Sequence, residues 1–96
     1  MPLLMAESIP ETEIELLQAL RSGDQHALKS IFNSYFNYLC TTAYQYLADE
    51  HLAKDLTQEV FFELWKRREI LEIKTSLKFY LRRAVINKSL KLIKSR

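Results

Sequence analysis

The chain contains one glycine and two prolines among its 96 residues, and this scarcity constrains its fold more than any other feature. Sheets and hairpins depend on turns, and turns use glycine and proline heavily. We therefore expect helices joined by very short connections. No apolar run approaches the roughly 18 residues of a membrane-spanning helix, so we expect no membrane span.

Apolar spacing and capping signals predict a compact all-α bundle of about four helices. Residues 1–11 are expected to form a flexible N-terminus, and the domain is expected to span 12–96. Thr12 and Glu15 have the spacing of a capping box for a short first helix, which Gly23 would end.

Three further helices follow from the same signals. They are expected over about 25–47, from the joint at 48–50 to about 68, and from 76 to the end of the chain, with Asp24, Asp49 and Ser76 as their caps. Residues 69–75 alternate without a clear helical period, and we expect a loop there.

The net charge of +2 hides a marked asymmetry. Residues 1–73 carry six Lys/Arg against all twelve Asp/Glu, whereas residues 74–96 carry eight Lys/Arg and no acid. Such a division is typical of a chain with one end that binds a polyanion.

The third expected helix carries more aromatic rings than one buried stripe needs. Phe61 and Trp65 are expected to pack within the bundle, and the alternative for Trp65 is a half-exposed ring whose N–H binds water. A different side combines acids, an amide and one ring: Asp55, Gln58, Glu59 and Phe62. An acidic side with an aromatic anchor suits a basic partner helix. The alternative is a solvated polar face with one stray phenylalanine.

The fourth expected helix interleaves cations with rings. Its candidate nucleic-acid contacts are Lys78, Arg82, Arg83, Asn87, Lys88 and Lys91, with Phe79 and Tyr80 as possible stacking platforms. Cations hold phosphates while rings accept unstacked bases, which is the chemistry of single-strand binding. Two alternatives stay open: a basic helix that only improves solubility, or one that lies on a membrane surface.

Signals for catalysis, a metal or a cofactor are absent from the sequence. His26 and His51 are isolated, and no glycine-rich phosphate loop is present. We therefore expect no enzyme. The one cysteine, Cys40, is expected to be a small buried hydrophobe and fits a reducing compartment, so we expect the cytoplasm.

The run Asp55-Leu56-Thr57-Gln58-Glu59-Val60-Phe61, with Leu64-Trp65 after it, resembles a signature of bacterial sigma factors. The extracytoplasmic-function group is the most similar. LLQALRSGDQHALKSIFNSYF resembles that group's opening helices, and SLKFYLRRAVIN resembles its segment ending in asparagine. The resemblance covers about residues 14–96 and corresponds to the first conserved domain, sigma-70 region 2.

The resemblance implies specific roles. Asp55, Gln58, Glu59 and, as an addition, Phe62 would dock on the β′ clamp helices of RNA polymerase core. The loop at about 68–76 would hold a flipped base of the promoter −10 element. The cations of the fourth helix and Asn87 would contact the opened non-template strand. An anti-sigma factor is a further possible partner.

The chain also departs from the family pattern. Tyr80 replaces a frequent tryptophan, and Lys91 stands where an acid is common. We expect that the chain is a fragment that lacks a second, −35-binding domain; the alternative is a shortened member of the family. The alternative function is a helical protein–protein adaptor whose basic helix binds acidic partners or a membrane surface.

Overall fold

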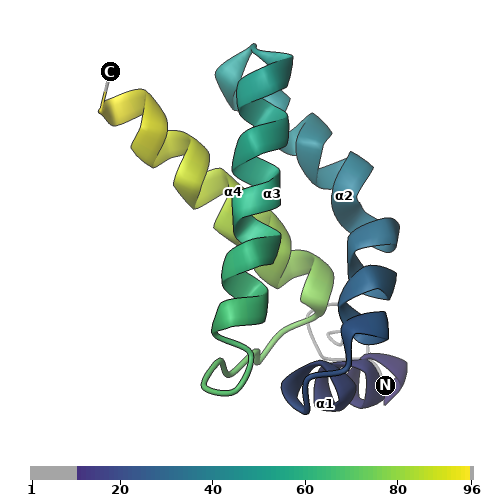
Figure 1. Cartoon of the computed structure of the whole chain (residues 1–96). Helices are drawn as coiled ribbons and strands as arrows, with labels where there is room; N and C mark the ends of the chain where they lie inside the picture. Colours follow the sequence, from purple (N-terminus) through teal and green to yellow (C-terminus); the bar gives the residue numbers. More distant parts are fainter. Residues whose placement is uncertain (1–10, 96) are drawn as a thin grey trace, which may run out of the picture.

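The computed structural model describes residues 11–95 and contains four helices (Figure 1): α1 (Glu11–Arg21), α2 (Gln25–Leu47), α3 (Glu50–Lys66) and α4 (Leu77–Lys94). This confirms the expected all-α bundle. The expected flexible N-terminus lies outside the described residues, apart from Glu11, which is helical. Within residues 11–95, no helix is both long enough and apolar enough to cross a membrane.

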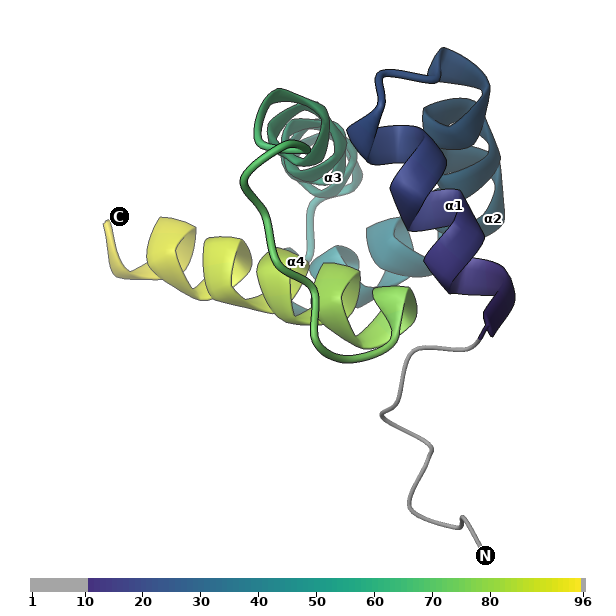
Figure 2. The same ribbon diagram turned by 90° about the horizontal axis from the view of Figure 1, so that it is seen from below.

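The helices surround one apolar core. α2 and α3 form an antiparallel pair, α4 crosses them obliquely, and α1 lies across the base of α2 (Figure 1). The largest fully buried apolar side chains come from α2, α3 and α4: Ile31, Leu39, Leu64, Leu77, Leu81 and Val85. The C-terminal turns of α4 extend beyond the rest of the bundle in both views (Figure 2).

The aromatic residues of α3 separate as their helical positions require. Phe61 is buried, and its ring centroid lies 4.9 Å from that of Phe32, which stacks on Phe36 at 4.5 Å. Trp65 is half-buried under the guanidinium of Arg68, 4.1 Å from the ring centroid. Both therefore pack in the bundle, as predicted.

Three of the predicted helix caps are confirmed. Backbone N–H groups donate to Asp24 from His26 at 2.9 Å, to Asp49 from Leu52 at 3.0 Å, and to Ser76 from Phe79 at 3.2 Å. Each cap residue has an extended backbone, so its side chain can reach the N–H groups that the first helical turn leaves without a partner.

The predicted cap at Thr12 is wrong, because α1 already begins at Glu11. An N-cap residue has non-helical backbone angles, whereas Thr12 lies inside the helix. Glutamate is a good helix former and extends the helix by this residue. The third helix is also shorter than predicted: α3 ends at Lys66 instead of at about 68, so the connection between α3 and α4 spans 67–76.

The end of α1 requires glycine. Gly23 has φ +93°, its N–H donates to the carbonyl of Leu20, and the N–H of Asp24 donates to the carbonyl of Ala19. This pair of bonds is a Schellman motif, in which the left-handed position favours glycine. Ala48, which ends α2, is the one described non-glycine residue with positive φ, at 53°.

The connection over 67–76, here called the reading loop, begins with a turn and continues as an extended segment. In its extended part, from residue 71 on, Leu71, Ile73 and Thr75 are partly buried, whereas Glu72 and Lys74 are exposed. Leu71 and Ile73 pack against the core. The alternation in the sequence therefore reflects a segment with an inner and an outer side.

Gly23 and Ala48, the two described residues with positive φ, give a matched pair of stability predictions. Gly23→Ala is expected to lower the free energy of unfolding by about 1–2 kcal/mol, because a Cβ at this φ is strained. Ala48→Gly is expected to raise it by about 0.5–1 kcal/mol through relief of the same strain. Urea denaturation measures both, and equal signs for the two changes would contradict the prediction.

Candidate nucleic-acid interface

The expected partner-binding side of α3 is exposed. Asp55, Gln58, Glu59 and Phe62, here called the acidic face, are all open to solvent on one side of the helix. The Phe62 side chain is 60% exposed, and the ammonium of Lys66 lies 4.8 Å from its ring centroid. A ring this exposed contributes little to packing within the bundle and is open to contact with a partner.

The outer side of α4 borders an open hollow of about 430 Å³, here called the α4 hollow. Its lining contains two cations, two rings, an amide, a hydroxyl and one aliphatic group: Arg82, Arg83, Phe79, Tyr80, Asn87, Thr75 and Ile86. Thr75 belongs to the reading loop, so the hollow lies where that loop joins α4. Five of the expected nucleic-acid residues thus meet at one place.

The two rings of the α4 hollow differ in accessibility. Phe79 is 45% exposed and can offer a face to a stacked base. Tyr80 is half-buried, and burial raises the pKa of its hydroxyl; Arg67 opposes this rise and Glu63 adds to it. Tyr80 therefore keeps its proton and can donate a hydrogen bond at neutral pH.

The other three expected cations lie outside the hollow. The ammonium of Lys78 sits 4.8 Å from the ring centroid of Tyr38 on α2. Lys91 is exposed and borders a groove of about 530 Å³ between α3 and the end of α4, which Asp55 and Glu59 also line. The ammonium of Lys88 forms ion pairs with two acids of α3.

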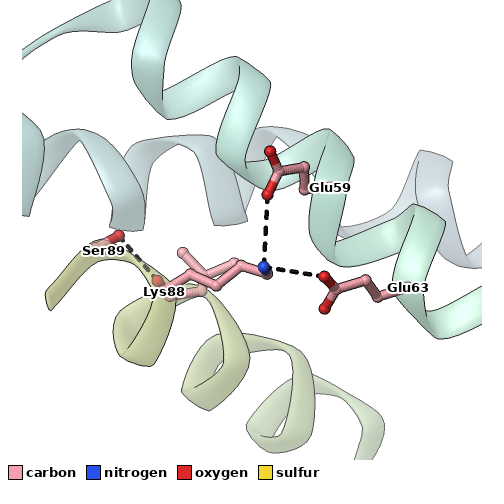
Figure 3. Close-up of polar contacts among 5 residues, drawn as sticks. Glu59, Glu63, Lys88 and Ser89 are labelled. Atoms are coloured by element: carbon pink, nitrogen blue, oxygen red, sulfur yellow. Dashed lines mark hydrogen bonds and ion pairs between the residues drawn. The ribbon is translucent and has the colours of Figure 1, made fainter. Parts of the chain in front are cut away.

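Lys88 joins α4 to the acidic side of α3 (Figure 3). Its ammonium lies 3.1 Å from a carboxylate oxygen of Glu63 and 3.4 Å from one of Glu59. Partial burial disfavours the charged lysine, but the hydrogen bonds and charges of Glu63 and Glu59 outweigh it, so the pKa of Lys88 is raised. Among the cations of α4 in residues 77–94, Lys88 is the only one that forms an ion pair with an acid of the described residues.

The structure offers no candidate metal centre among the residues it describes. No group of three or more His, Cys, Asp or Glu side chains there lies close enough to hold a metal ion. Cys40 is half-buried, and burial raises the pKa of its thiol, which Thr57 and Lys54 oppose. A raised thiol pKa reduces the thiolate fraction, which is the nucleophilic form.

A family model described as sigma-70 region 2 matches residues 31–96. The chain belongs to the sigma-70 region 2 family. Members of this family are non-enzymatic domains of transcription initiation factors. Membership supports a role in promoter recognition and RNA polymerase binding. Neither the curated proteins nor the solved structures that were searched include a match to the chain.

Sequence reasoning missed several residues of the site. Ile86 and Thr75 line the α4 hollow, and Glu63 is the nearer partner of Lys88. Glu63 lies four residues after Glu59 and so shares its side of the helix, a spacing that could have indicated a shared cation. The pairing with α4 itself depends on the crossing of the two helices, which no local pattern shows.

The Lys88 pair gives a stability prediction. Lys88→Met keeps the aliphatic stem and should lower the free energy of unfolding by less than about 1 kcal/mol, because both carboxylates are well exposed. The loss should fade at about 1 M salt, where charges are screened over about 3 Å. Lys91→Met is the control, since no ion pair joins Lys91 to the described residues. A larger loss that persists in salt would show that the lysine acts through packing.

Proposed function

We propose that this domain is the promoter-melting domain of a sigma factor of the extracytoplasmic-function group. It docks on RNA polymerase core through the acidic face and reads the opened −10 element through the α4 hollow and the reading loop. The carrying observation is the α4 hollow, which gathers cations, rings and an amide beside a loop in a chain of this family. The proposal places the protein in the cytoplasm, where polymerase acts.

The chemistry of the α4 hollow fits an unpaired strand better than a duplex. Opening DNA costs roughly 1.4 kcal/mol per base-pair step, so a protein without a fuel molecule must trap unpaired bases. Arg82 and Arg83 would hold the phosphates, Phe79 would stack a base, and Asn87 would bond to a base edge. Tyr80 and Thr75 add hydroxyl groups on the loop side.

The acidic face fits the β′ clamp helices as a basic partner. Phe62 would supply the buried anchor, and Asp55, Gln58 and Glu59 would fix the orientation through charge and hydrogen bonds. The remaining acids of the domain would repel DNA from surfaces other than α4 and so orient the basic helix toward it. A masking anti-sigma protein is a further partner that the family resemblance implies.

The adaptor alternative requires neither a shared acidic face nor a hollow beside the loop. Both features are present, with Asp55, Gln58 and Glu59 exposed together and Thr75 lining the α4 hollow. They support the sigma-factor proposal over the adaptor, whose only specific feature is the basic helix.

Single-strand binding tests the role of the α4 hollow. In fluorescence anisotropy, the chain with polymerase core should bind −10-like strands more tightly than a scrambled strand. Phe79→Ala should weaken binding by about 1–3 kcal/mol through the loss of one stacked base. Arg83→Ala should weaken binding to all strands and reduce the salt dependence. Equal, purely salt-controlled binding to every strand, unchanged by core, would contradict the proposal.

Polymerase binding tests the acidic face separately. Phe62→Ala and Asp55→Lys should each weaken binding to core about tenfold or more, because an interface anchor contributes more than about 1 kcal/mol. Both positions are exposed, so the fold should be kept. Glu59→Lys is a poorer choice, because it would also set a cation against Lys88.

The matched control for the docking test is Phe79→Ala, which removes the same phenyl ring from the α4 hollow instead of from the acidic face. It should leave core affinity unchanged while single-strand binding falls. Unchanged core affinity in folded Phe62→Ala and Asp55→Lys variants would refute docking through this face.

A further inference from the structure

Two charged side chains of α1 bind the segment that leads into α4, one within the reading loop and one at the first residue of α4. The guanidinium of Arg21 donates to the carbonyl oxygen of Leu71 at 3.1 Å. The carboxylate of Glu13 accepts from the backbone N–H of Leu77, the first residue of α4, at 2.8 Å. Figure 2 shows α1 beside the segment that leads from α3 into α4.

The bond from Leu77 completes the start of α4. The first N–H groups of a helix lack partners within it, and Ser76 satisfies only that of Phe79. Glu13 satisfies that of Leu77 and places a negative charge at the positive end of the helix dipole. The hydroxyl of Tyr35 donates to the other oxygen of Glu13 at 3.3 Å, which anchors the carboxylate to α2.

Apolar contacts support the same arrangement. Leu17 and Leu20 of α1 surround a small hollow of about 50 Å³ together with Leu64 of α3 and with Leu71 and Ile73 of the reading loop. The inner side of the loop therefore rests on α1 and α3. Arg21 also lines this hollow, directly beside the carbonyl that it binds.

We infer that Glu13 and Arg21 are positioning residues for readout of the −10 element: they fix the reading loop and the start of α4 so that the α4 hollow is preformed. This inference rests on the proposed function. It concerns a helix outside residues 31–96, the part of the chain that the family model matches. A loop held in its bound shape avoids the entropy cost of ordering when it binds a base.

The test uses the full 96-residue chain with polymerase core and measures the affinity ratio between a −10-like strand and a scrambled strand. Arg21→Ala and Glu13→Ala remove the contacts, whereas Arg21→Lys keeps a cationic donor and Glu13→Gln keeps a carbonyl acceptor. Lys29→Ala and Glu15→Ala are controls with the same change of charge at exposed sites. Hydrogen exchange over residues 70–77 reports the loop directly.

Each alanine change is expected to lower the affinity ratio about three- to tenfold, the size that one net hydrogen bond supports. Loop amides should exchange faster, core affinity should stay unchanged, and the two conservative variants should recover much of the ratio. The controls should match the unmodified chain. Unchanged core affinity in the alanine variants separates positioning from a loss of folding, because an unfolded variant would lose both activities.

Two results would overturn the inference in distinguishable ways. If the unmodified chain discriminates between strands and both alanine variants discriminate equally well, the positioning role fails while the proposed function stands. If the unmodified chain shows no preference even with core, the proposed function fails and the positioning role fails with it.

Discussion

The burial of one side of α4 against α2 and α3 is the interaction on which the rest of the structure depends. Leu77, Leu81 and Val85 have no exposed surface, and Ser89 continues the same side with its hydroxyl bonded to the Val85 carbonyl at 2.8 Å. This stripe fixes the rotation of the helix about its axis. Phe79, Arg83 and Asn87 must then lie away from the core, because helical geometry sets them on other sides.

Local signals predicted most of the fold. Apolar spacing and the caps Asp24, Asp49 and Ser76 act within a few residues, so the sequence shows them directly. The cap at Thr12 failed because the helix begins two residues before the start that this cap predicts, and helix ends carry weak signals over such a distance. The contacts of Lys88 with Glu63 and of Glu13 with Leu77 join residues far apart in the chain. Such contacts depend on how helices cross, and a single sequence holds no pattern for that.

The charge division of the sequence becomes a division of surfaces in the fold. Asp55 and Glu59 of α3 line the groove beside the end of α4, and among the α4 cations in the described part of the chain the acids of α3 form ion pairs only with Lys88. Arg82 and Arg83 lie at the α4 hollow without such partners in residues 11–95. Two cations without an acidic partner in the described residues thus lie beside two rings, an arrangement in which charge and stacking surface can act at the same place.

The alternating extended part of the reading loop has a consequence for how this chain can vary. Most surface connections accept insertions and deletions readily. Here one added or lost residue would exchange the inner and outer sides, turning Glu72 inward and Leu71 or Ile73 toward solvent. Burial of an unpaired carboxylate is costly. The length of this connection is therefore as fixed as that of a core strand, although its side chains on the outer side are free to differ.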